Sequence, residues 1–262
     1  GLILFTAYPM VSSFYQSFTK FNIINPPEFI GLDNYRRMFF EDDDFMKALK
    51  NTIWISVISI PLRICFAIFT AWLLTRPKHG SKIYRTLFFI PSMVPAVAAT
   101  IVFTFVFNPI YGPINRTLEG VGIDNPPYWF LDPNWSKWGL ILLGLWGIGD
   151  TMIIFLAGLL DVPKSLYEAA ELEGASTWQT FRYITLPLLT PVIFFSGVTG
   201  VIGSFQYFTQ AFVASGQVND YSKAMYFYAT HIYEMAFKTY EMGYASALAW
   251  FLLLITLVCT LI

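Results

Sequence analysis

The stretch that decides the fold class is Thr52-Ile-Trp-Ile-Ser-Val-Ile-Ser-Ile-Pro-Leu-Arg-Ile-Cys-Phe-Ala-Ile-Phe-Thr-Ala-Trp-Leu-Leu-Thr75. Its 24 residues include a single charged one, Arg63. About 20 apolar residues in helical form cross the hydrocarbon core of a bilayer. Because lipid offers the backbone no hydrogen bonds, a helix is the economical structure for such a segment. The stretch therefore predicts a membrane-spanning helix.

Five further apolar runs of near-spanning length accompany it, and they are Leu2–Phe18, Thr86–Phe107, Trp138–Leu160, Leu188–Phe212 and Gly243–Ile262. Only 13% of the 262 residues are charged, against about 25% in soluble domains. We therefore expect an all-α polytopic membrane protein with six transmembrane helices, forming a single transmembrane domain over residues 1–262. The run Leu2–Phe18 is interpreted as part of a first span rather than as a signal peptide, since no basic n-region or cleavage site accompanies it.

The charged residues also predict an orientation. Residues 76–85 contain four Lys or Arg and no acidic residue, which favours a cytoplasmic loop. Alternation then places residues 161–187 and both chain ends inside, and residues 20–51, 108–137 and 211–242 outside. Within the first outer segment, residues 35–41 and 45–50 have helix-like apolar spacing, so we expect two amphipathic helices at the interface.

The inner loop of residues 161–187 has clear helix signals. Pro163 suits the first turn of a helix, the run Glu168-Ala-Ala-Glu-Leu-Glu173 has high helix propensity, and Gly174 can end it. A second helical run, Thr177–Leu186, follows until Pro187. The loop thus predicts two short helices whose acidic, Ala-rich surface suits docking into a groove on a partner.

This loop resembles the EAA loop of ABC importer permeases. Glu168-Ala-Ala is followed after three residues by Gly174, and after nine more by Ile184-Thr-Leu-Pro187. Four further segments are similar to the carbohydrate, maltose-permease-like branch, and they are Leu156-Ala-Gly-Leu-Leu-Asp-Val-Pro163, Gly31-Leu-Asp-Asn-Tyr35, Ala48-Leu-Lys-Asn-Thr52 and Met242-Gly-Tyr-Ala-Ser-Ala-Leu-Ala-Trp250. The resemblance covers essentially the whole chain and implies a type I ABC importer permease fold.

The resemblance also implies the partners. It predicts a complex with a second permease subunit, two ATPase subunits and an extracytoplasmic solute-binding protein. The permease subunits of this complex would lie in the bacterial plasma (inner) membrane. The ATPase cleft would receive Tyr167, Glu168, Ala169, Ala170, Glu173, Gly174 and Ala175. The chain has no Gly-x-x-x-x-Gly-Lys-Ser/Thr motif, so we expect no cofactor and no enzymatic activity of its own, with ATP and Mg held by the ATPases.

The chain departs from the family pattern in two places. Glu173 stands where the family usually has Asp, and Ala214-Ser-Gly-Gln-Val-Asn-Asp220 replaces a Thr-Gly-Gly-Gly-Pro stretch. The second difference affects the outer mouth, and with it the identity of the solute.

Two charged residues fall within predicted spans. Arg63 lies near the middle of the second span and Asp150 near the middle of the fourth. A charge at this depth is costly and must face protein or water. The two could pair with each other, Asp150 could line the transport pathway and bind substrate hydroxyls, or a span boundary could lie elsewhere.

The fifth span carries a polar stripe. Thr199, Gly203, Gln206 and Gln210 are spaced 4, 3 and 4 residues apart, which places them on one face of a helix. This face should line the pathway or bond a neighbouring helix. Aromatic surfaces for a sugar could come from the nearby Tyr207, Phe205 and Trp146.

The remaining residues predict no other chemistry. His79 and His231 have no second ligand at metal-binding spacing, and Cys65 and Cys259 are expected to be small buried hydrophobes. The predicted function is a permease subunit that imports a sugar or oligosaccharide by alternating access, with release beside Thr199 and Gln206. The alternatives are a polyol or glycerol-phosphate-type solute, an integral-membrane enzyme, and an ion channel.

Overall fold

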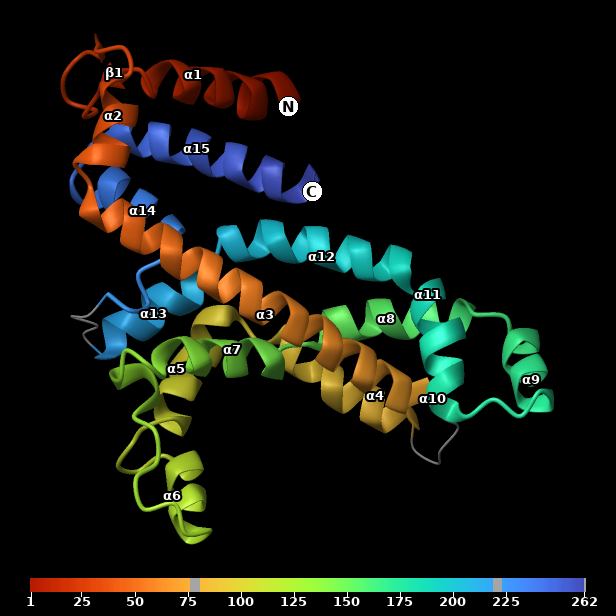
Figure 1. Cartoon of the computed structure of the whole chain (residues 1–262). Helices are drawn as coiled ribbons and strands as arrows, with labels where there is room; N and C mark the ends of the chain where they lie inside the picture. The colour runs from red at the N-terminus through yellow and green to blue at the C-terminus, as the bar shows by residue number, and fades with distance from the viewer. Residues whose placement is uncertain (76–80, 219–222, 262) are drawn as a thin grey trace. The chain divides into compact units, whose positions relative to one another are not determined.

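The computed structural model describes residues 1–75, 81–218 and 223–261, and most of them are helical (Figure 1). The α-helices are α1 (Tyr8–Gln16), α2 (Asp33–Phe40), α3 (Asp43–Thr75), α4 (Ser81–Phe89), α5 (Ala96–Val106), α6 (Pro113–Gly120), α7 (Ser136–Trp146), α8 (Gly149–Asp161), α9 (Lys164–Leu172), α10 (Thr177–Thr180), α11 (Leu186–Leu188), α12 (Thr190–Phe205), α13 (Thr209–Val218), α14 (Tyr228–Tyr233) and α15 (Met242–Leu261). The π-helical segments are η1 (Ile3–Ala7), η4 (Phe181–Thr185) and η5 (Glu234–Lys238), and the 3₁₀ segments are η2 (Ile90–Met93) and η3 (Trp129–Leu131). Two short strands, β1 (Thr19–Lys20) and β2 (Glu28–Phe29), pair antiparallel, with Thr19 opposite Phe29.

The chain forms two compact units that alternate along the sequence. The first comprises Gly1–Ser56, Pro127–Lys137 and Val201–Ile262, and the second comprises Val57–Pro126 and Trp138–Gly200. Three of the four boundaries fall inside α3, α7 and α12, and the fourth lies between Pro126 and Pro127.

In the first unit, α15 packs against α1, α2 and α14. The core consists of Met38, Phe45, Tyr228, Tyr244, Ala247 and Leu248. The β1 turn is fixed from α2, where Asn34 Nδ2 donates to the carbonyl oxygens of Ser17 (2.9 Å) and Thr19 (3.0 Å). Gly243 of α15 approaches the same turn so closely that a Cβ there would lie 2.0 Å from Thr19 O. Only glycine fits this contact.

In the second unit, the C-terminal half of α3 packs against α8. Ala67, Ala71 and Leu74 recur at helical spacing on α3, and Met152, Phe155, Leu156 and Leu159 do so on α8. Leu189, between α11 and α12, closes this core. Gly158 lets α8 approach Leu189 and Val192, because a Cβ would meet their side chains at 3.0–3.1 Å.

The described residues contain three helical segments long and apolar enough to cross a membrane, over Asp43–Thr75, Thr190–Gly216 and Met242–Leu261. The second of them joins α12 to α13 across a short break at residues 206–208. Two bent pairs raise the number to five if each pair is one span. They are Lys82–Met93 with Ala96–Val106, bent by 100°, and Ser136–Trp146 with Gly149–Asp161, bent by 51°. These segments match five of the six predicted runs. The sixth run, Leu2–Phe18, is helical over Ile3–Gln16 but shorter than these segments, so the six-span count stays a prediction.

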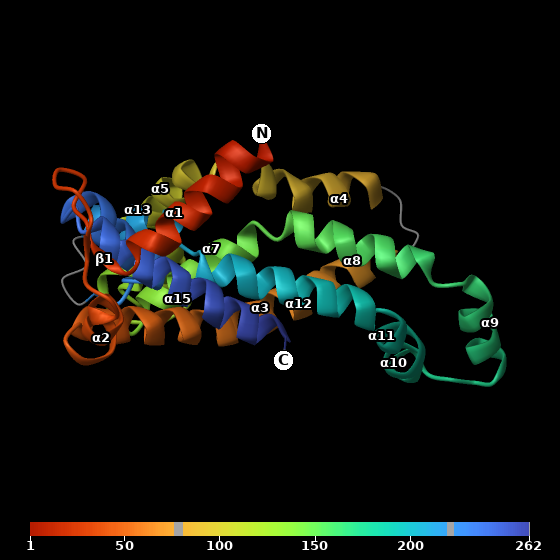
Figure 2. The same ribbon diagram turned by 90° about the horizontal axis from the view of Figure 1, so that it is seen from above.

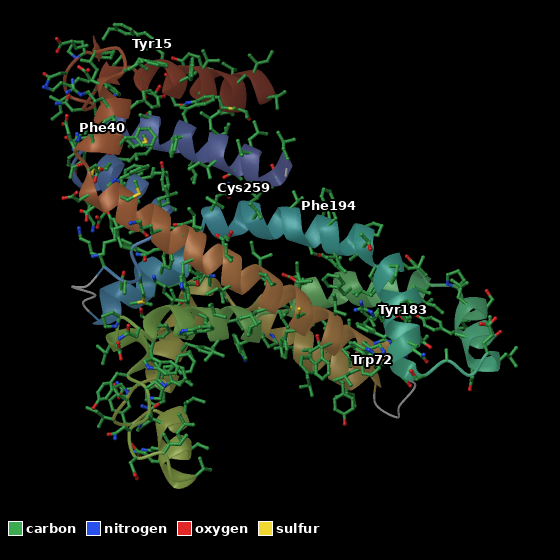
Figure 3. All side chains as sticks on the ribbon, in the orientation of Figure 1. Tyr15, Phe40, Trp72, Tyr183, Phe194 and Cys259 are labelled. Atoms are coloured by element: carbon green, nitrogen blue, oxygen red, sulfur yellow. The ribbon has the colours of Figure 1, made fainter. Side chains whose placement is uncertain are left out.

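Two local expectations are wrong. Residues 45–50 form no separate interfacial helix, because α3 runs unbroken from Asp43 to Thr75. Cys65 and Cys259 are exposed in this chain rather than buried, so in the membrane they face lipid or another subunit. Large apolar side chains such as Tyr15, Phe40 and Phe194 are exposed as well (Figure 3).

Candidate functional site

The inner loop forms the two helices that the sequence predicts. α9 follows Pro163, lies beyond the end of α8 in both views (Figures 1 and 2), and turns most of its surface to solvent. Glu168, Ala169 and Glu173 are exposed and Leu172 is 90% exposed, whereas Ala170 is buried and Tyr167 half-buried. The exposed side of α9 therefore presents carboxylates together with an apolar side chain.

Gly174 ends α9 because the turn needs a left-handed backbone. Its φ is +74°, and no atom lies within 4 Å of where a Cβ would be, so the requirement is conformational rather than steric crowding by neighbours. The turn is hydrogen-bonded, with Ala175 N–H donating to Ala170 O (2.9 Å) and Gly174 N–H donating to Glu171 O (3.0 Å). This is a helix end of the type that favours glycine.

The second helix begins at Ser176 with a capping box. Gln179 N–H donates to Ser176 Oγ (3.3 Å), and Ser176 N–H donates to Gln179 Oε1 (2.7 Å). These reciprocal bonds satisfy backbone donors that a helix start otherwise leaves open. The helical run does not stop at Pro187, as the sequence suggested, since η4 and α11 continue it to Leu188.

A side-chain hydrogen bond joins α9 to η4, which continues the second helix of the loop. Tyr167 Oη and Thr185 Oγ1 share a hydrogen bond of 3.1 Å. Around it lies a hollow of about 480 Å³ lined by Trp72, Thr75, Leu159, Tyr167, Glu171, Ala175, Thr177, Thr180, Phe181 and Thr185. Trp72 at the end of α3 borders the hollow, while Tyr183 on η4 points outward (Figure 3). α9 therefore touches the membrane helices through few side chains.

Asp150 lies in the first turn of α8, directly after the break in its bent span. Its Oδ1 accepts a hydrogen bond from Ser92 Oγ at 3.1 Å, and Ser92 belongs to η2 at the break of the other bent span. Asp150 is exposed in this chain. Arg63 lies in α3, and its pairing with Asp150 stays a prediction. Trp146, at the end of α7, is 41% exposed with its ring 5.3 Å from that of Phe103.

The polar stripe of the fifth span is interrupted. Thr199 lies in α12 and Gln210 in α13, but Gln206 and Tyr207 fall in the break between these helices. The single continuous helical face is therefore wrong, because the stripe was inferred from unbroken 3.6-residue spacing. Tyr207 stacks edge-on against Phe227 at 5.6 Å. The role of these residues in a pathway stays a prediction.

The sequence missed a buried polar cluster around His231. His231 Nε2 lies 2.9 Å from Asp42 Oδ2, and its Nδ1 lies 2.9 Å from Tyr226 Oη, which donates to Glu234 Oε2 at 2.7 Å. Tyr244 Oη donates to the same oxygen of Asp42. The partners are up to 202 residues apart in the chain, so no local motif could have revealed them.

Burial and charge shift the pKa values in this cluster. Burial lowers the pKa of His231, although Asp42, Asp44 and Glu234 act in the opposite direction. Burial alone would raise the pKa of Asp42, but hydrogen bonds from Tyr244, the Phe45 N–H and His231 outweigh it and lower the pKa. These shifts favour the uncharged form of His231 and the ionised form of Asp42. Within the described ranges, no group of three His, Cys, Asp or Glu is arranged to hold a metal ion.

Residues outside the described part include some of those behind the predicted orientation. Arg76 and Lys78 of the basic loop lie outside it, as does the end of the segment Ala214–Asp220. Lys82 and Arg85 lie in α4. The orientation stays a prediction.

Comparison with known proteins assigns a family. Residues 63–262 match the family described as binding-protein-dependent transport system inner membrane component. Over its whole length the chain is 41% identical to a probable ABC transporter permease protein, YesP, of Bacillus subtilis, covering 85% of that protein. It is 32% identical to the arabinooligosaccharides transport system permease protein AraP of the same species, covering 83% of it. It is 31% identical over 88% of its length to the lactose transport system permease protein LacF of Rhizobium radiobacter, covering 78% of it.

A solved structure has the same fold. It is described as a bacterial ABC transporter involved in the import of the acidic polysaccharide alginate, and it matches with a TM-score of 0.84. The match covers 99% of this chain and 88% of the other, at 24% identity. A methionine ABC transporter matches less closely, with a TM-score of 0.52, over 84% of this chain and 94% of its own at 16% identity.

Proposed function

The chain belongs to the family of binding-protein-dependent transport system inner membrane components, and we propose that it is a permease subunit of an ABC importer for a sugar or oligosaccharide. The observation that carries the proposal is the exposed α9 with its Gly174 turn. It presents the Glu168-Ala-Ala segment at the loop where a permease of this kind would meet an ATPase.

The relatives support a sugar as the solute. Those named for lactose and for arabinooligosaccharides match 88% or more of this chain. A sugar is recognised by carboxylate, amide and aromatic side chains, and Asp150, Gln206, Gln210, Tyr207 and Trp146 offer these groups in or next to the apolar helices. Thr199 adds a hydroxyl in α12. These residues are our candidates for the pathway.

The partners follow from the family and from the surface of α9. In this family ATP hydrolysis belongs to separate subunits, so we assign ATP and Mg to two ATPases. Their clefts would receive Tyr167–Ala175, with Leu172 buried in the joint. A second permease subunit would complete the pathway, and a solute-binding protein would deliver the sugar. The alginate transporter has been solved together with a periplasmic protein that binds an alginate pentasaccharide.

The mechanism is alternating access. Closure of the ATPases on ATP would move α9, and the Tyr167–Thr185 contact would pass this movement to η4 and α11, which lead into α12. Residues 161–187 and both chain ends would be cytoplasmic, with residues 20–51, 108–137 and 211–242 outside. Binding-protein docking on the outside would then be coupled to opening of the pathway inside.

The test is uptake by the complete transporter in proteoliposomes, with its own ATPase, partner permease and binding protein. We expect ATP-dependent uptake of at least one labelled oligosaccharide from a panel of lactose, arabinotriose and maltotriose. Vesicles that lack the ATPase are the control and should show none. Uptake of glycerol 3-phosphate or a polyol, with no uptake of any sugar, would favour the alternative solute class.

A further inference from the structure

The two bent spans touch at their break points. Gly149 begins α8, and a Cβ on it would lie 2.8 Å from Phe89 Cα and 2.9 Å from Phe88 O. The backbone of one span is therefore in direct contact with the backbone of the other, and both belong to the same compact unit. Substitution of Gly149 by any other residue would force the breaks apart.

Ser92 and Asp150 form the polar contact at this junction. Ser92 Oγ lies 3.1 Å from Asp150 Oδ1 and 2.8 Å from Phe89 O. A hydroxyl has one proton and can donate to only one of these acceptors at a time. A carboxylate offers about four acceptor positions, and among the described residues Ser92 is the side chain that fills one. Asp150 thus keeps most of its acceptor capacity.

The junction lies near the middle of the membrane. Asp150 comes 14 residues after Ser136 and 11 before Asp161, and Ser92 comes 10 residues after Lys82 and 14 before Val106. α8 continues for 11 residues after Asp150, and at about 1.5 Å per residue this places Asp150 near the midplane of a hydrocarbon core about 30 Å thick, with Ser92 beside it through their hydrogen bond. An exposed carboxylate is not tolerated against lipid at that depth. Asp150 must therefore meet water, solute or protein in the assembled transporter.

The position of Asp150 at a helix start explains only part of this arrangement. A negative charge in the first turn of α8 interacts favourably with the N–H groups there, which makes the carboxylate tolerable without using its acceptor positions. In transporters, interrupted helices often meet at the solute site. Vicinal hydroxyls of a sugar are the donors that would fill these positions.

We propose that Ser92 and Asp150 form a hydroxyl-binding pair of the transport pathway, which accepts neutral sugars and rejects anionic ones. The proposal rests on the proposed function and adds to it a selectivity for uncharged over anionic solutes. Asp150 accepts hydrogen bonds from sugar hydroxyls, and Ser92 holds the carboxylate in place. A uronate or phosphate group at this point would meet a like charge, so acidic sugars are disfavoured.

The test compares KM for a neutral and an acidic solute in proteoliposomes that contain the complete transporter. The neutral probe is the best-transported sugar of the lactose, arabinotriose and maltotriose panel, and the acidic probe is trigalacturonate. We expect Asp150→Asn to raise KM for the neutral sugar at least tenfold, as for loss of hydrogen bonds to a charged group, and to reduce the preference for neutral over acidic solute. Ser92→Ala should raise KM about threefold.

Two control substitutions are available in the same unit. Thr104→Ala removes a hydroxyl from the same bent span as Ser92, where it donates to Ile101 O, and Asp124→Asn neutralises an exposed carboxylate outside the spans. Neither should change KM. The proposal is overturned if Asp150→Asn leaves KM and solute preference unchanged. It is also overturned if Asp150→Asn prevents assembly and the exchange Arg63→Asp with Asp150→Arg restores it, because the carboxylate is then a structural partner. If wild-type vesicles transport no sugar at all, the proposed function itself fails.

Discussion

His231 and Asp42 are 189 residues apart in the chain, yet Nε2 of the histidine lies 2.9 Å from Oδ2 of the aspartate. The histidine is 1% exposed. Asp42 directly precedes α3 and His231 lies in α14, so the contact ties the start of a spanning helix to the segment before α15. Buried polar groups that are paired in this way fix one arrangement of the elements that carry them.

The burial of His231 and the hydrogen bonds to Asp42 make the first unit sensitive to acid. The pKa of His231 is lowered in the folded chain, so the unfolded chain takes up this proton first as the pH falls below about 6.5. The lowered pKa of Asp42 adds stability above about pH 4 that is lost below it. Both shifts make the folded chain less stable as the pH falls. We expect the Tm of the purified transporter to fall by several degrees between pH 7 and pH 5. Intrinsic tryptophan fluorescence during heating measures this Tm.

His231→Gln separates this effect from general acid sensitivity. The amide cannot titrate, so the variant should be less stable at pH 7 and should lose less Tm than the wild type between pH 7 and 5. Equal slopes for the two proteins would show that His231 does not contribute to the acid response.

Gly174→Val should uncouple ATP hydrolysis from uptake. Valine is strained at a φ of +74°, because β-branched residues rarely adopt left-handed backbone. The turn that joins α9 to α10 would rearrange while the rest of the chain stays folded. We expect ATPase activity of the assembled complex to persist and sugar uptake to fall at least tenfold. Gly174→Asn is the matched control, since asparagine tolerates this backbone, and it should keep most of the uptake. Wild-type uptake by the valine variant would contradict the role of the turn.

Gly243→Ala should destabilise the first unit. The added Cβ would lie 2.0 Å from Thr19 O, a backbone atom that the α2 side chain of Asn34 holds in place. Overpacking of this kind costs about 1–3 kcal/mol or more. Expression level and Tm are the measurements. Gly197→Ala in α12 meets no atom within 4 Å and should leave both unchanged or slightly raised.

Asn51→Asp should destabilise the same unit through lost donors. Asn51 Nδ2 donates to the backbone carbonyls of Lys223 (3.1 Å) and Tyr226 (2.9 Å). A carboxylate would instead place acceptor against acceptor, and leaving such buried groups unpaired costs about 1–3 kcal/mol each. The loss is measured as a fall in Tm. Asn25→Ala, at an exposed position, is the comparison and should leave Tm nearly unchanged. A similar fall in Tm for both variants would show that the Asn51 contacts are not specifically stabilising.

The features predicted correctly from the sequence depend on local signals. A largely apolar run of 24 residues is enough to predict α3 from Thr52 to Thr75, and helix formers followed by glycine are enough to predict α9 and its end. The 100° bend was not predicted, although Pro95, the residue before α5, is a local sign of it. These signals act within a few residues, so one sequence carries them completely.

The features that were missed depend on distant partners. No proline marks the break between α7 and α8; what distinguishes it is the contact of Gly149 with the backbone of Phe88 and Phe89. His231 was set aside because no metal ligand lies near it in sequence, whereas its partner Asp42 lies near the other end of the chain. Such pairs become visible only when the chain has folded.

The link between α9 and α10 is short and held by hydrogen bonds, so the two helices cannot easily move independently. Three residues, Glu173–Ala175, separate the end of α9 from the cap at Ser176, and the backbone N–H of each is already bonded within the turn. In the proposed mechanism, a displacement of α9 by the ATPase would therefore be transmitted directly to α10. One residue inserted after Gly174 would lengthen this link by up to about 3.5 Å, and we expect it to weaken the transmission of movement from α9 to the membrane helices.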